Sequence, residues 1–124
     1  DGRGETQSAL APAENILQPN PDVDAFFAIN DPSAMGVVAA LEAQGKAGEV
    51  HVYGVDGAPE GKQAMKEGTM HGSGAQSPKG LAEGSVELGY KILAGEDVGE
   101  HKQYVETFAI TPDNVDEYGV DSWQ

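Results

Sequence analysis

Three polar side chains follow three apolar runs of the sequence, each at the point where a predicted strand ends. Asn30 follows the run at residues 24–29, Asp56 follows the run at 50–55, and Gln76 follows the run at 69–75. In parallel α/β sheets the carboxyl ends of the strands meet at one edge, where ligands collect beside helix N-termini. A carboxylate accepts hydrogen bonds from hydroxyl groups, and an amide both donates and accepts. The spacing therefore predicts a binding edge for a neutral polyhydroxyl ligand, and a sugar fits it better than a nucleotide.

Each of these positions also has a purely structural interpretation. Asp31 is expected to be a helix N-cap, because Pro32 follows it directly and suits the first helical position. Asn30 has no structural role that the sequence assigns. Asp56 precedes a glycine and fits ordinary turn chemistry, while Gln76 precedes a serine–proline cap pair and fits an ordinary loop. Three such residues on one predicted edge favour the binding interpretation more than any one of them does.

Other kinds of chemistry find little support in the residues. No phosphate-binding glycine motif follows a strand, and the three histidines, at positions 51, 71 and 101, have no short-spaced partner for a metal. The serines lack a nucleophile-elbow context. We therefore expect no catalytic residue, no metal site and no cofactor. One enzymatic alternative stays open, a small flavodoxin-like enzyme or phosphoacceptor domain that uses Asp56.

The elements that must position the three side chains repeat along the chain. Glycine and proline separate short apolar runs from helical patterns, and this alternation predicts βαβ units with a parallel sheet and flanking helices. We expect strands at 24–29, 50–55, 69–75 and 103–110, and helices at 7–18, 32–44, 60–67 and 78–94, with a last short helix after 111–114. Pro12 lies inside the first helical pattern, so that helix is expected to start near Pro12 or to bend there.

Composition limits the partners. The 7 Lys and Arg residues against 21 Asp and Glu residues give a formal charge of −14, which disfavours nucleic acid and anionic membrane surfaces. No apolar run is long enough to cross a bilayer, and there is no cysteine for disulfides or thiolate chemistry. The start of the chain shows no secretion-signal pattern. The 124 residues are expected to form a single unit with one modest core.

Four segments together resemble the type I periplasmic sugar-binding proteins of the ribose-binding group. Residues 25–36 (AFFAINDPSAMG) are similar to a strand-to-helix segment of that family, and residues 53–57 (YGVDG) to its G-[FV]-D-G strand end. Residues 74–78 (GAQSP) are similar to its A-Q-x-P step, and residues 110–115 (ITPDNV) to the tail of its members. The segments occur in order over almost the whole chain.

The resemblance implies capture of a pentose or hexose in the periplasm or outside the cell and its delivery to an ABC permease. It implies that Asn30, Asp56 and Gln76 hydrogen-bond the sugar hydroxyls. Family members are longer and close two lobes over the ligand, so this chain is expected to be most of the C-terminal lobe, an incomplete lobe with a half-site. The helix at 78–94 would then pack with the other lobe, and the isolated chain would need that lobe, a partner or self-association to cover it.

A second reading shares the same motifs. The effector-binding domain of a LacI-type transcriptional repressor has this fold, but it requires a basic DNA-binding segment elsewhere in its chain. The acidic charge and the tail at 110–115 favour the transport protein over the repressor.

Overall fold

The chain folds as an α/β unit around one four-stranded sheet. The computed structural model describes residues 1–99 and 102–123. The strands lie in the order β1 (Ala25–Phe27), β2 (His51–Asp56), β3 (Gly72–Ala75) and β4 (Phe108–Ile110). The first three are parallel and β4 runs antiparallel to β3. The predicted mostly parallel sheet is confirmed, and its parallel strands bring the residues after β1, β2 and β3 to one edge.

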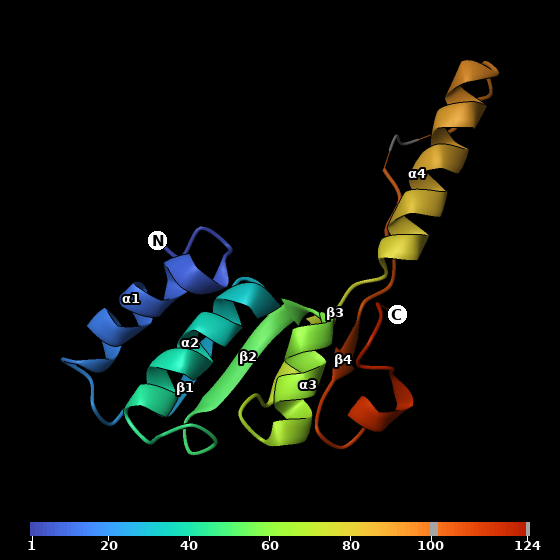
Figure 1. Cartoon of the computed structure of the whole chain (residues 1–124). Helices are drawn as coiled ribbons and strands as arrows, with labels where there is room; N and C mark the ends of the chain where they lie inside the picture. Colours follow the sequence, from blue (N-terminus) through green and yellow to red (C-terminus); the bar gives the residue numbers. More distant parts are fainter. Residues whose placement is uncertain (100–101, 124) are drawn as a thin grey trace.

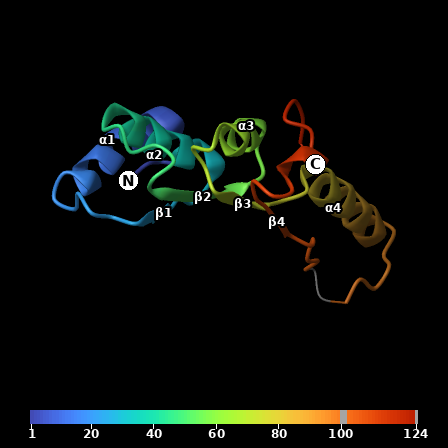
Figure 2. The same ribbon diagram turned by 90° about the horizontal axis from the view of Figure 1, so that it is seen from below.

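Three helices cover one face of this sheet (Figures 1 and 2): α1 (Thr6–Leu17), α2 (Asp31–Ala43) and α3 (Pro59–Glu67). Both α2 and α3 carry proline in the first turn, and Gly68 ends α3 in the left-handed conformation. α1 begins at Thr6, so a start near Pro12 is wrong. Ala9, Ala13 and Leu17 of α1 are buried, and α1 packs against α2. This packing offsets the backbone hydrogen bond that the interior proline removes.

The core lies between these helices and the sheet. It consists of small and medium-sized aliphatic side chains with methionine and contains no fully buried aromatic ring among the described residues. Its larger members, from α1, α2, β2, the α3–β3 region and β4, are Leu17, Leu41, Val52, Met65, Met70 and Ile110. The small side chains let α2 approach β2 closely, and this approach shapes the sheet edge described below.

Three strands are shorter than the sequence suggests. β1 covers three residues of the expected run at 24–29, β3 covers four residues of the expected run at 69–75, and β4 covers only the end of the expected run at 103–110. The chain after Thr111 forms a single 3₁₀ turn, η1 (Val115–Glu117), in place of the expected short helix. Alternating apolar residues predict a strand only where a neighbouring strand is available, and β3 offers β4 three paired positions.

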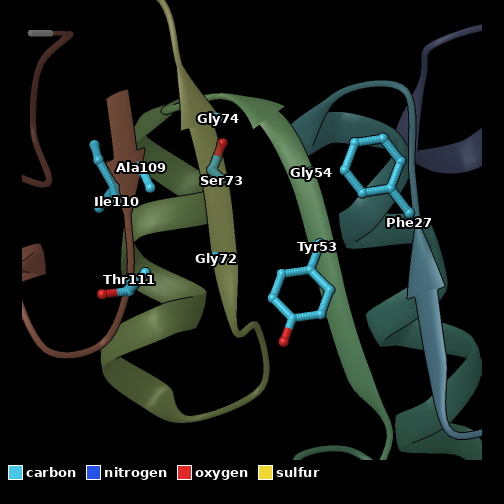
Figure 3. A pocket seen from close by; sticks show the side chains of 9 residues that line it. All are labelled: Phe27, Tyr53, Gly54, Gly72, Ser73, Gly74, Ala109, Ile110 and Thr111. Atoms are coloured by element: carbon cyan, nitrogen blue, oxygen red, sulfur yellow. The ribbon is translucent and has the colours of Figure 1, made fainter. Parts of the chain in front are cut away.

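Among the described residues, no helix covers the opposite face of the sheet (Figure 2). Figure 3 shows the hollow on this face, with a volume of about 330 Å³, between the rings of Phe27 and Tyr53 and the small residues of β3 and β4. Phe27 is 75% exposed there. The hollow is lined mostly by apolar side chains and glycine backbone, so it has the character of a packing surface.

α4 (Pro78–Leu93) begins at the carboxyl edge of the sheet and projects away from the rest of the molecule (Figure 1). The Ser77 hydroxyl accepts a hydrogen bond from the Gly80 amide, which confirms the predicted cap. None of its residues is buried, although the helix carries large apolar side chains, among them Tyr90 and Leu93. Within the described residues, no helix has the length and apolar character needed to cross a membrane.

We expect the backbone amides of α4 to exchange with solvent much faster than those of α2. An isolated helix of this length is marginally stable in water, whereas eight residues of α2 are buried. Hydrogen–deuterium exchange with mass spectrometry, at two protein concentrations, measures both helices in one experiment. Equal and concentration-independent protection of α4 and α2 would contradict this description of α4.

Candidate functional site

The predicted pair Asp56 and Gln76 meets at the carboxyl edge of the sheet. The Gln76 side-chain amide donates to the Asp56 carboxylate (Nε2 to Oδ1, 2.8 Å). The Gln76 backbone amide donates to the Asp56 carbonyl (3.0 Å), one step beyond the last β2–β3 pair. Both side chains are half-buried. The edge therefore presents a carboxylate already oriented by an amide, which is an arrangement that accepts hydroxyl groups.

The backbone at Asp56 is strained. Its φ is 120°, a conformation that favours glycine, and non-glycine residues held in such regions cost about 1–3 kcal/mol each. Two backbone amides after Asp56 are held by buried side chains: Gly57 N–H donates to Ser73 Oγ (2.9 Å), and Ala58 N–H donates to Asp31 Oδ2 (2.7 Å). These hydrogen bonds hold the turn in its strained conformation and so fix the orientation of Asp56, as is common at binding sites.

Asp31 is the centre of this arrangement. Its side chain is fully buried at the start of α2, and Ser73 Oγ donates to its second oxygen, Oδ1, at 2.7 Å. Gly61 leaves room for it, because a Cβ atom there would lie 2.7 Å from Oδ2, and a Cβ atom at Gly54 would also collide with Oδ1. α3 has no side-chain cap of its own, so the bond from Asp31 to Ala58 N–H supplies one from α2.

Burial is also the main electrostatic effect at this position. Desolvation raises the pKa of Asp31, and the neighbouring Asp56 carboxylate adds to the rise, while the bonds from Ser73 and Ala58 oppose it. Lys62 on α3 is buried as well, and its ammonium donates to the Ser122 carbonyl at 2.6 Å. Desolvation lowers the pKa of Lys62, and the Asp31 carboxylate opposes that shift.

Asn30 lies at the same edge, after β1, but its hydrogen bonds run elsewhere. Its Oδ1 accepts from Ser33 N–H (3.0 Å), and its Nδ2 donates to the Gly4 carbonyl (2.9 Å). The expectation that Asp31 caps α2 is wrong, because Asn30 is the N-cap; the view that Asn30 has no structural role is wrong for the same reason. Asn–Asp–Pro offers two capping side chains in sequence, and burial of the second leaves the first to cap. The amide of Asn30 keeps one N–H and one lone pair for a ligand.

Two residues of this site were missed by sequence reasoning, the buried Asp31 and its partner Ser73. A carboxylate at a helix start is most simply an N-cap, and a serine in a glycine-rich strand has no obvious role. The signal that was available is the set of very small residues around the second strand: Gly54 within it, Gly57 and Ala58 after it, and Gly61 one turn further. Such a set marks a place where another group approaches the backbone closely.

The three histidines, which the sequence analysis considered as metal ligands, do not form a site within the described residues. His51 is exposed, and its ring lies 4.3 Å from that of His71, centroid to centroid. His71 Nδ1 already accepts the Val52 N–H (3.2 Å), and burial lowers the pKa of His71. His101 lies outside the described residues. No group of three or more metal-ligating side chains gathers within the part of the chain that the structure describes.

Comparison with known proteins agrees with the fold. The family model described as "Periplasmic binding protein domain" matches residues 2–97. The ribose import binding protein RbsB of Salmonella typhimurium is 44% identical over 85 residues, which are 68% of this chain and 28% of that protein. The D-allose-binding periplasmic protein of Escherichia coli is 40% identical over 80 residues, 64% of this chain and 26% of that protein. The chain thus spans less than a third of the length of these relatives.

Solved structures give the same result over more of the chain. An ABC transporter periplasmic solute binding protein from Actinobacillus succinogenes, with bound D-allose, has a TM-score of 0.88 and 32% identity, covering 94% of this chain and 41% of that one. An ABC transporter solute binding protein from Bacillus halodurans, with bound myo-inositol, has a TM-score of 0.86 and 35% identity, covering 95% and 40%.

Replacing Ser73 by alanine is expected to destabilise the fold. The change leaves the buried Gly57 N–H and Asp31 Oδ1 without their partner, at about 1–3 kcal/mol for each unpaired group. Urea unfolding followed by circular dichroism measures the loss. Ser85→Ala is the matched control, because Ser85 is exposed on α4. Equal stability of the two variants would show that the Ser73 hydroxyl does not support the turn.

The raised pKa of Asp31 predicts a pH-dependent contribution to stability. A carboxyl whose folded pKa lies above its unfolded value of 3.8 stabilises the fold fully below that value, and the contribution is lost as the pH rises through the folded pKa. The unfolding free energy of the wild type, minus that of Asp31→Asn, should therefore fall as the pH rises above 3.8 and then level off. Urea unfolding across this range tests it, with the exposed Asp22→Asn as control. A difference that rises with pH would have the wrong sign and would overturn the assignment.

Proposed function

The chain belongs to the periplasmic binding protein domain family, and from this premise we propose that it binds a neutral polyhydroxyl ligand, a pentose or hexose sugar, at the carboxyl edge of its parallel strands. The observation that carries the proposal is the bonded Asp56–Gln76 pair, held in a strained conformation by the buried Asp31–Ser73 network. Strain maintained at this cost is typical of residues that contact a ligand. The Asp56 carboxylate accepts hydrogen bonds from hydroxyl groups and would repel an anion, so the pair suits a neutral ligand.

Each of the three side chains has a proposed role. Asp56 and Gln76 both hydrogen-bond sugar hydroxyls, and Gln76 also orients the carboxylate of Asp56. Asn30 contributes its second N–H from the neighbouring strand end, while its other groups cap α2 and hold the Gly4 carbonyl. Because β1, β2 and β3 are adjacent and parallel, their carboxyl ends share one edge of the sheet, and we propose that the three side chains contact one ligand there.

We infer further that the chain delivers its ligand to an ABC permease, from the periplasm or the space outside the cell. The names of the relatives support this: one is an import binding protein for ribose and another is a periplasmic protein that binds D-allose. Such a protein captures and releases its ligand without chemical change, so we propose a binding role and no enzymatic one. Both proposals concern a chain that spans a minority of each relative's length.

The projecting helix α4 is proposed to pack against a second lobe. α4 starts two residues after Gln76, so it leaves the molecule directly from the binding edge. Its exposed apolar side chains, such as Val86 (59%) and Leu93 (86%), are unusual on a helix that only contacts solvent. A lobe seated on α4 would face the edge and bury the other side of the ligand, as hinged two-lobed proteins do. A partner chain or self-association would cover the same surface.

The two alternatives are less well supported. An effector domain of a LacI-type repressor would have the same edge, but the named relatives are binding proteins of import systems, and the chain is strongly acidic. A phosphoacceptor site at Asp56 needs a divalent cation held by a second carboxylate. The oxygens of Asp31 accept hydrogen bonds from Ala58 N–H and Ser73 instead, which leaves Asp31 poorly placed for a cation.

Sugar binding by this chain is expected to be weak but localised. One edge buries only part of a monosaccharide, so we expect a dissociation constant of roughly millimolar or weaker. Titration with D-ribose, D-allose and myo-inositol, followed by ¹H–¹⁵N NMR, should shift the side-chain NH₂ signals of Asn30 and Gln76 and the backbone amide of Gly57. Asp56→Ala should abolish these shifts.

The matched control is Asp22→Ala, which removes an exposed carboxylate before β1, at the opposite edge of the sheet. It should leave the shifts unchanged. If no sugar moves the signals of Asn30, Gln76 or Gly57, or if Asp56→Ala responds like the wild type, then the proposed edge is not the binding site.

A further inference from the structure

The hydroxyl of Ser33, in the first turn of α2, is buried and has no hydrogen-bonding partner among the described residues. The residue is only 6% exposed. A buried hydroxyl without a partner destabilises the fold, so native proteins pair nearly all such groups with protein, water or ligand. Neither the Asp31–Ser73 network nor the capping of α2 uses this oxygen. It is therefore a polar group near the binding edge whose partner is still to be assigned.

Ser33 lines a cavity of about 360 Å³ between the start of α2 and the first turn of the chain. Its other lining residues are Asp1, Gly2, Arg3, Gly4, Ile29 and Asn30. A Cβ atom at Gly2 would lie 3.8 Å from Ser33 Oγ, so the turn at residues 1–4 passes beside the hydroxyl. Asn30 belongs both to this cavity and to the candidate edge, whereas Asp56 and Gln76 do not line the cavity.

We propose that Ser33 is a specificity-determining residue, whose hydroxyl binds one hydroxyl group of the same polyhydroxyl ligand that Asn30 contacts. This inference rests on the proposed function and extends its site toward residues 1–4. The serine hydroxyl both donates and accepts, which matches a sugar hydroxyl. Asn30 links the two sides of the cavity, because its side chain donates to the Gly4 carbonyl on one side and accepts from Ser33 N–H on the other.

The same cavity does not suit an anion. The start of α2 has few free donors: Ser33 N–H is bonded to Asn30 Oδ1, Ala34 N–H to the Asn30 carbonyl, and Pro32 has no N–H. The Asp1 carboxylate and the Arg3 guanidinium both line the cavity, so their charges offset each other and favour neither an anion nor a cation. A neutral hydroxyl group is the ligand chemistry that remains.

Ser33→Ala should change stability and binding in opposite directions. The variant removes an unpaired buried hydroxyl and places a better helix former in α2, so its urea midpoint should be higher than that of the wild type. In NMR titrations with D-ribose, D-allose and myo-inositol, its affinity should be about two- to tenfold weaker for the best ligand, the effect of one lost hydrogen bond. Ser85→Ala gains only the helix propensity, so it should leave the affinity unchanged and raise the urea midpoint by less than Ser33→Ala does.

Deoxy analogues identify the ligand group involved. One monodeoxy derivative of the best ligand should bind wild type and Ser33→Ala equally, because it lacks the hydroxyl that Ser33 contacts. If Ser33→Ala lowers the urea midpoint, the hydroxyl has a structural partner such as a buried water, and the inference is wrong. If Asn30 and Gln76 respond to sugar and Ser33→Ala binds as the wild type does, the subsite is wrong and the proposed function stands. If no sugar moves those signals, the proposed function fails and the subsite fails with it.

Discussion

Burial of the Asp31 carboxylate is the constraint on which the binding edge depends. Placing this group between α2, α3 and β3 requires a donor for each oxygen, since an unpaired buried carboxylate would cost several kcal/mol. Ser73 and Ala58 N–H supply the donors, and glycine at 54 and 61 supplies the space. The same bonds hold the turn after β2. The same hydrogen bonds and small residues therefore stabilise the buried carboxylate of Asp31 and fix the conformation of the turn that carries Asp56.

Sequence reasoning identified the parts of the fold that follow from local chemistry. Alternation of short apolar runs with proline-started helices predicted the parallel strands, and parallel strands place Asn30, Asp56 and Gln76 at one edge. A residue that follows a parallel strand lies at the carboxyl edge of the sheet whatever its side chain contacts, so the presence of these three residues at that edge could be predicted from the sequence. The bond between Gln76 and Asp56 was not predicted; it forms because β2 and β3 are neighbours, Asp56 ends β2 and Gln76 follows β3.

Features that depend on tertiary packing were not predictable from sequence. Asn30 and Asp31 are both good N-caps, and only the burial of Asp31 under α3 decides that Asn30 caps α2. The extent of β4 depends on how far β3 runs beside it. The apolar pattern of α4 is typical of a packed helix, yet a pattern cannot name the surface that covers it. In this chain α4 projects from the sheet edge, and the returning segment lies along part of it through Gln103 and Val105.

The edge combines several features that oppose stability, and their concentration is informative. Asp56 has a positive φ, the pKa of Asp31 is raised by desolvation, and the Ser33 hydroxyl has no partner in the described structure. Elsewhere in the described chain the carboxylates are exposed and the core is aliphatic. Sequences optimised for stability alone would replace all three features, with glycine at 56, an apolar residue at 31 and alanine at 33. Their gathering around one sheet edge indicates that the edge is shaped by a requirement other than folding, and a ligand rich in hydroxyl groups meets it.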